Sequence, residues 1–263
     1  IVADIDLEAV QETLAKLDQY QQEKGLPALS QKFTTLRFDV TGVWDELAPR
    51  IDRIVRDAPD EASAVRALTE VFRQLPGQIA RKPALPFQAD LVVSSLVGSI
   101  LGVFVSEYVE FLLNRKFPAF GHFERAGELL QLIMLAKTAL EVKYLRGLQA
   151  CVNPGGRLYL SETVCGAEFG KAEEEQVLSG EFLKDVTQFM LKQNGQSMLS
   201  PEYGDLTKEL FAEQDVRVWP WVQVPIEEEK PGYVFVVLAY CLLPNKSPVA
   251  AQQGSNYTDG GKK

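Results

Sequence analysis

Apolar residues recur every three or four positions in several parts of this chain, which is the period of an amphipathic helix. The pattern is clearest in Leu7–Glu23, Val43–Arg56 and Glu61–Leu75, with polar residues between the apolar ones. A longer helix is predicted over Glu124–Leu148, with an apolar stripe of Leu129, Ile133, Ala136, Leu140 and Leu145. The remaining predicted helices are Leu96–Leu113, Gly180–Gln193 and Asp205–Glu213, the last with Asp205 as its N-cap.

Short runs of β-branched and aromatic residues predict strands between these helices. The predicted strands are Ile1–Asp6, Thr34–Val40, Ala89–Ser95, Arg157–Ser161, Val216–Val224 and Tyr233–Leu243. The run Ala89–Ser95 is nearly continuous in apolar character, as expected of a strand covered on both faces. Three prolines and a glycine in Pro76–Pro86 predict a connecting loop, and Asn153–Gly156 predicts a turn.

Strands and helices alternate through the first two-thirds of the chain, which predicts a mainly parallel sheet with helices on both faces. The link Glu227–Pro231 is too short for a crossover helix, so the last two strands are expected to form an antiparallel hairpin. The fold class is therefore predicted as α/β with a C-terminal antiparallel strand hairpin.

Composition removes several classes of function. The 263 residues are 46% hydrophobic and 24% charged, which is ordinary for a globular protein, and the net charge is −9. Without a basic cluster, an acidic chain is not expected to bind nucleic acid. The uncharged stretch Leu91–Ser106 is shorter than the roughly 20 residues that span a bilayer, so no membrane segment is predicted. One histidine and three scattered cysteines predict no metal site, no disulfide framework and a cytoplasmic setting.

Four segments carry more specific information. IVADID and RFDV are short strands that end near an acid, ADLVVSS is an apolar strand that ends in serines, and VNPGGRLYLSE is a turn followed by a strand. In this order they resemble the second to fifth strands of the class I S-adenosylmethionine-dependent methyltransferases. The turn segment is the most specific of the four, and the resemblance covers about Ile1–Pro244. It implies a Rossmann-like fold and methyl transfer from S-adenosylmethionine to a small-molecule or protein acceptor.

The resemblance also implies a cofactor site at the carboxyl ends of these strands. Asp4, with its neighbour Ile5, matches the acid that holds the ribose hydroxyls, and Asp39, with Val40, matches the residue that contacts adenine. Ser94 and Ser95 lie at the end of the matching fourth strand. Each has a structural alternative: the two acids can cap the helices that follow them, and small serines can simply permit close packing.

Candidates for catalysis and substrate binding are fewer. Glu162 follows the predicted fifth strand and can act as a base or bind substrate, although a solvated acid fits equally well. His122 lies in an aromatic-rich segment between two helices, where it can accept a proton or contact substrate. Tyr108 and Phe120 can line an apolar substrate pocket, or they can belong to the core.

One departure from the family pattern is expected to matter. The Gly-rich loop after the family's first strand is absent, and that strand lies centrally, between the second and the fourth. The chain is therefore expected to be incomplete at its N-terminus; a permutation using the segment Cys165–Gly170 is the alternative. Two other functions stay open: a non-catalytic binding protein with this fold, and a nicotinamide-dependent oxidoreductase, which shares the acid after the second strand.

The domain organisation follows from the same comparison. One methyltransferase-like domain is predicted over residues 1–244, with helical lid insertions at about 107–148 and 164–213. A polar tail rich in Gly and Ser at 245–263 is expected to be disordered. The oligomeric state and the methyl acceptor are left open.

Overall fold

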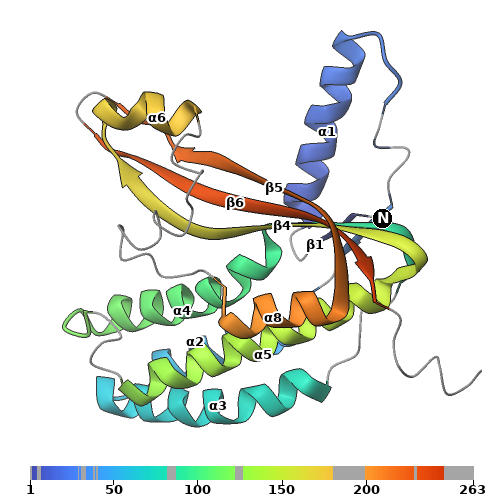
Figure 1. Cartoon of the computed structure of the whole chain (residues 1–263). Coiled ribbons are helices and arrows are strands. Elements are labelled where there is room, and N and C mark those ends of the chain that lie inside the picture. Colours follow the sequence, from blue (N-terminus) through green and yellow to red (C-terminus); the bar gives the residue numbers. More distant parts are fainter. Residues whose placement is uncertain are drawn as a thin grey trace, which may run out of the picture. The chain divides into compact units, whose positions relative to one another are not determined.

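The computed structural model describes residues 2–4, 7–28, 30, 34–37, 39, 41–81, 87–121, 127–179, 199–227 and 230–245 (Figure 1). It divides into two compact units. The first consists of Ile1–Leu85 and Phe104–Tyr144, and the second of Pro86–Val103 and Leu145–Lys263. The predicted Gly180–Gln193 helix and the predicted disordered tail, except residue 245, lie outside the described residues. The single domain predicted over 1–244 stays a prediction.

The first unit is mainly helical. Its elements are β1 (Val2–Asp4), α1 (Leu7–Glu23), β2 (Thr35–Arg37), α2 (Trp44–Asp57), α3 (Glu61–Arg81), the later part of α4 (Val97–Lys116) and most of α5 (Gly127–Cys151). The two short strands β1 and β2 pair in parallel, with Val2 opposite Thr35 and Asp4 opposite Arg37. The helix predicted over Leu7–Glu23 is confirmed at both ends.

The core of this unit is built from the apolar stripes that the sequence predicts. In α2 the buried residues are Leu47, Ile51 and Val55. In α5 the residues predicted to form the stripe, Leu129, Ile133, Ala136 and Leu140, are all at most 2% exposed. Burial of one such side chain contributes about 1.5–3 kcal/mol, so these faces fix the helices more strongly than intrinsic propensity does.

The loop predicted over Pro76–Pro86 is wrong in its first part, because α3 continues through Pro76 to Arg81. Proline in a helix removes one backbone hydrogen bond and costs roughly 3 kcal/mol relative to alanine. The residues on either side continue the buried stripe, since Leu75 is 0% and Ile79 is 1% exposed. Burial of this face therefore outweighs the proline penalty.

The second unit contains a four-stranded sheet. Its elements are β3 (Ala89–Ser95), β4 (Val152–Phe169), η3 (Lys171–Glu173), α6 (Glu174–Ser179), α8 (Pro201–Leu210), β5 (Phe211–Val224) and β6 (Gly232–Pro244), with the start of α4 and the end of α5. The strand order is β3-β4-β6-β5, and β6 lies between β4 and β5 (Figure 1). Only β3 and β4 pair in parallel in this sheet. The predicted antiparallel hairpin is confirmed as β5 and β6.

The described chain therefore combines helices with an open mixed sheet, which is compatible with the predicted α/β class. The mainly parallel sheet is not confirmed. Within the described strands, parallel pairing is limited to β1 with β2 and β3 with β4.

β4 is much longer than the strand predicted over Arg157–Ser161. It pairs with β3 at Val152 and again from Arg157 onward, so the four residues predicted as a turn bulge out between these two positions. Gly155 has a φ of +82°, which favours glycine. A Cβ on Gly156 would lie 2.8 Å from the carbonyl oxygen of Asp90, so this position also requires glycine.

Four further predictions are corrected in the second unit. β3 is not covered on both faces, because Leu91 and Val93 are 61% and 62% exposed. The last predicted helix begins earlier, at Pro201, and ends at Leu210. Its N-cap is Ser200 and not Asp205, because the Ser200 Oγ accepts a hydrogen bond from the Tyr203 N–H. Residues 164–169 and 211–213 of the predicted helical lid at 164–213 are strand.

Among the described helices, α4 is long and apolar enough to cross a membrane by length and composition, with about a third of its most apolar window buried in the fold. A core helix of a soluble protein passes the same test, so this feature alone decides nothing about a membrane.

Candidate functional site

The carboxyl end of β3 lies beside the middle of β4, which continues to Phe169, and this region carries several polar side chains. Because the two strands are parallel and in register, Ser95 at the end of β3 lies opposite Ser161 on β4. The Ser161 hydroxyl lies 3.1 Å from the Ser95 hydroxyl, within hydrogen-bond distance. Ser94 is buried and Ser95 is exposed, so the two predicted serines differ in their access to solvent.

A strained turn follows directly. Leu96 has a φ of +61°, in the left-handed region that a bulky side chain rarely adopts. Its N–H donates a hydrogen bond of 2.6 Å to the carbonyl oxygen of Ser161, and α4 begins at the next residue. Backbone strain of this kind persists only where neighbouring contacts fix it, and it is typical of ligand sites.

The turn and the start of α4 are held by the carboxylate of Glu162. Its Oε1 accepts hydrogen bonds from the Gly98 N–H at 3.1 Å and the Tyr203 hydroxyl at 2.7 Å, and its Oε2 accepts one from the Ser99 N–H at 2.8 Å. Two of these donors are free backbone groups of the first turn of α4, where a negative charge is favoured. Glu162 thus binds the N-terminus of α4.

The fit around this carboxylate is tight. A Cβ on Gly98 would lie 2.6 Å from the Glu162 Oε1 and 2.7 Å from the Tyr203 hydroxyl oxygen. Glu162 is 0% and Tyr203 is 3% exposed. Burial raises the pKa of Glu162, and the hydrogen bonds from Tyr203, Ser99 and Gly98 act in the opposite direction.

This arrangement gives Glu162 a definite structural role. A carboxylate without exposed surface does not reach a substrate in this conformation. The prediction that Glu162 follows the end of its strand is wrong, because β4 continues to Phe169. The role of Glu162 as a base stays a prediction. The solvated acid that was the alternative is wrong, because the side chain is buried.

Ser99 ties the turn to β4 a second time. Its Oγ accepts a hydrogen bond of 3.2 Å from the Thr163 N–H and donates one of 3.3 Å to the carbonyl of Leu96. Sequence reasoning missed both Ser99 and Tyr203. Small residues at the start of α4 were a weak signal for Ser99, but nothing in the local sequence pointed to Tyr203.

The other predicted cofactor residues belong to the first unit. Asp4 ends β1 and lies in register with Arg37, which ends β2, so it occupies the carboxyl end of its strand as predicted. Asp39 caps α2: its carboxylate accepts hydrogen bonds from the Thr41 N–H at 2.9 Å and the Trp44 N–H at 2.6 Å. The capping alternative is thereby observed, and adenine contact stays a prediction. Ile5 and Val40 lie outside the described residues.

The predicted substrate residues in the first unit differ in exposure. Tyr108 is partly buried and packs edge-on against Trp44, with ring centroids 5.2 Å apart; burial and the charge of Asp52 raise its pKa. Phe120 is 1% exposed, so it belongs to the core here and offers no surface to a substrate. His122 lies outside the described residues.

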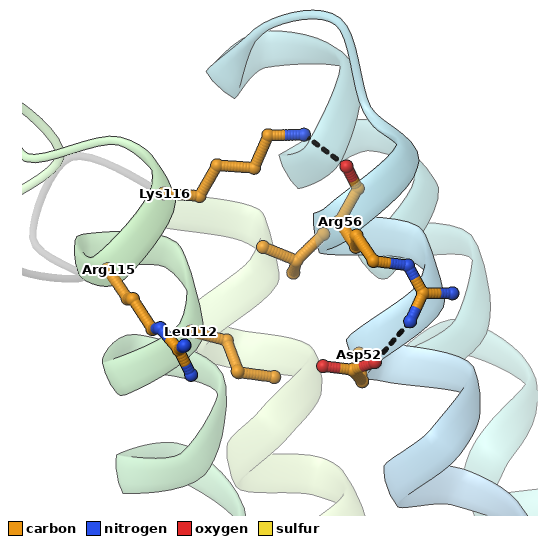
Figure 2. A pocket seen from close by; sticks show the side chains of 6 residues that line it. Asp52, Arg56, Leu112, Arg115 and Lys116 are labelled. Atoms are coloured by element: carbon orange, nitrogen blue, oxygen red, sulfur yellow. Dashed lines mark hydrogen bonds and ion pairs between the residues drawn. The ribbon is translucent and has the colours of Figure 1, made fainter.

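A hollow of about 390 Å³ lies between α2 and α4 in the same unit, and Arg115 and Asp52 line opposite sides of it (Figure 2). Most of its charges already have structural partners. The Lys116 ammonium donates to the carbonyls of Arg56 and Ala58, the latter at 2.6 Å, and Arg56 pairs with Asp52 at 3.0 Å. These contacts stabilise the C-terminus of α2, so the hollow is a weaker candidate than the strand ends.

Thiol and metal chemistry find no support in the part of the chain that the structure describes. Burial raises the pKa of the Cys151 and Cys165 thiols to about 11, which keeps them protonated and unreactive near neutral pH. No three His, Cys, Asp or Glu side chains gather there as metal ligands.

In comparisons with known proteins, no family model, no curated protein and no solved structure matches the chain.

Proposed function

We propose that this chain has a Rossmann-like fold and transfers a methyl group from S-adenosylmethionine to a small-molecule or protein acceptor. In an open doubly wound sheet the third strand lies beside the second, and the fourth beside the fifth. The resemblance equates β1 and β2 with the second and third strands, and β3 and β4 with the fourth and fifth. The observed parallel pairs have these neighbours, which supports the proposal.

The observation that carries the proposal is the polar, strained end of β3, which lies beside Ser161 and Glu162 of β4. Ligands of open α/β sheets bind beyond the carboxyl ends of the strands. There, Ser95 is an exposed residue and Leu96 holds an unusual backbone conformation. Three groups of β4 bind this turn directly: the Ser161 carbonyl, the Glu162 carboxylate and the Thr163 N–H. The Tyr203 hydroxyl of α8 holds Glu162 in place, and together these contacts give the rigidity that a binding site needs.

Residues of the first unit would have specific roles toward the cofactor. Asp4 would accept hydrogen bonds from the ribose diol, because it is the last residue of a parallel strand. Asp39 would contact adenine only if its carboxylate released one of the four hydrogen bonds that it already accepts from Thr41, Trp44 and Asp45. S-adenosylmethionine supplies an activated methyl group, and the protein's task is in-line alignment of the acceptor. No described strand corresponds to the family's first strand with its Gly-rich loop.

The test is calorimetric titration of the chain with S-adenosylmethionine. Asp4→Ala removes charge-assisted hydrogen bonds worth about 1.5–3 kcal/mol, so Kd is expected to rise roughly 10- to 100-fold. Glu8→Ala, an exposed acid in the first turn of α1, is the control and should leave Kd unchanged. A wild-type chain that binds a nicotinamide dinucleotide and not S-adenosylmethionine contradicts the proposal in favour of an oxidoreductase.

One observation favours the non-catalytic alternative. Leu91, Val93 and Tyr159 are 61%, 62% and 39% exposed, and Val93 and Tyr159 are in register on neighbouring strands. An exposed apolar patch on a sheet is typical of an interaction surface. A chain that binds neither cofactor in the titration supports this second candidate.

The setting of the proposed reaction is the cytoplasm. All three cysteines are free, and Cys151 and Cys165 are buried as thiols, which fits a reducing compartment.

A further inference from the structure

Tyr203 connects two elements that the sequence separates widely. It lies in the first turn of α8, where its N–H is capped by the Ser200 hydroxyl. Its own hydroxyl donates a 2.7 Å hydrogen bond to Glu162, which is 41 residues away in the sequence. Because the first turn of α8 is capped, the phenol is presented to the carboxylate from a fixed backbone.

Glu162 connects Tyr203 to the first turn of α4. The same oxygen that accepts from Tyr203 also accepts from the Gly98 N–H, and the second oxygen accepts from the Ser99 N–H. All of these groups are buried, where an unsatisfied partner of a carboxylate is costly. A shift of the Tyr203 hydroxyl would therefore disturb the hydrogen bonds to the first turn of α4.

The first turn of α4 in turn fixes the strand end. Leu96 lies between Ser95 and the start of α4, and its φ of +61° requires restraint from both sides. On one side β3 pairs with β4. On the other side the restraint is the α4 N-terminus, held by Glu162. The orientation of the Ser95 hydroxyl therefore depends on the pairing of β3 with β4 and on the contacts between Glu162 and α4.

We propose that Tyr203 is a positioning residue for the site at the carboxyl end of β3, acting through Glu162 on the first turn of α4. With 3% of its surface exposed, Tyr203 does not contact a ligand itself. The inference rests on the proposed function for the identity of the ligand, S-adenosylmethionine, but the restraint on the turn is independent of it.

The test compares two variants that each remove one hydroxyl from α8. Tyr203→Phe deletes the bond to Glu162, whereas Thr207→Val deletes a 2.8 Å bond to the Tyr203 carbonyl and leaves Glu162 untouched. Hydrogen exchange measured by mass spectrometry is expected to speed up at least tenfold over Leu96–Ser99 in Tyr203→Phe only. The affinity for S-adenosylmethionine is expected to fall roughly tenfold in the same variant.

A double-mutant cycle separates positioning from general destabilisation. If Tyr203 acts through Glu162, Tyr203→Phe should change the affinity less than twofold in a Glu162→Gln background. Additive losses overturn the proposal, as does unchanged exchange over Leu96–Ser99 in the single variant. A wild-type chain that does not bind S-adenosylmethionine contradicts the proposed function alone, because the exchange measurement still decides the role of Tyr203.

Discussion

At the scale of single residues, Leu96 has a strained backbone conformation, with a φ of +61°. The left-handed conformation costs an L-residue roughly 1–2 kcal/mol, and a β-branched side chain fits it least. Leu96 keeps this conformation because its N–H is bound by Ser161 and its carbonyl by the Ser99 hydroxyl. The backbone contacts select the conformation, and the side chain has to tolerate it.

Replacing Leu96 by valine should therefore be costly. Leu96→Val removes one methylene and places a branch at Cβ, and the free energy of unfolding is expected to fall by about 1–2 kcal/mol. The same substitution at Leu91, which is 61% exposed in a strand, is the control and should change stability by less than about 0.5 kcal/mol. Urea denaturation of both variants measures the difference. Equal stabilities would show that the turn relaxes without cost.

At the scale of elements, α3 contains an interior proline that its packing tolerates. Pro76 leaves the carbonyl of Phe72 without its helical N–H partner, and α3 still extends to Arg81. Pro201, by contrast, lies at the first position of α8, where proline is favoured. The two positions make a matched pair.

Pro76→Ala restores the missing N–H and should raise the free energy of unfolding by about 1–2 kcal/mol. This is the roughly 3 kcal/mol helix penalty reduced by the stiffening that proline gives the unfolded chain. Pro201→Ala is expected to be neutral or slightly destabilising. Thermal unfolding of the two variants by circular dichroism checks both expectations. A loss of stability in Pro76→Ala would mean that the ring itself contributes more to packing than the hydrogen bond does.

Some of the elements and contacts could be predicted from the sequence, and others could not. Helices with a regular apolar stripe, such as α2 and α5, were predictable because burial follows periodicity. The continuation of α3 through Pro76 was not predictable, since it depends on which residues pack against the helix. Ser94 and Ser95 could be placed at a strand end from local pattern alone. The Glu162–Tyr203 bond could not, because it joins residues that no local pattern connects.

At the scale of the whole molecule, the two units share helices. Residues of both units occur in α4 and in α5, since the division falls at Phe104 in one and at Leu145 in the other. An uninterrupted helix propagates order along its length. We therefore expect the units to unfold together.

The tryptophans provide separate probes for this expectation. Trp44 belongs to the first unit, and Trp219 and Trp221 belong to the second. One variant keeps only Trp44, and a second keeps only Trp219 and Trp221. In each variant, the denaturation midpoint measured by fluorescence should equal the midpoint measured by circular dichroism. Midpoints that differ between the two probes would show that the units unfold independently.

The position of β6 in the sheet affects how the chain is made. β6 is the last described strand, yet it pairs with both β4 and β5, which leave the ribosome before it. Until β6 emerges, the long strand β4 lacks the neighbour that it pairs with over most of its length. During synthesis the second unit thus exposes unpaired strand edges for longer than the helical first unit, which makes nascent β4 a candidate for chaperone binding.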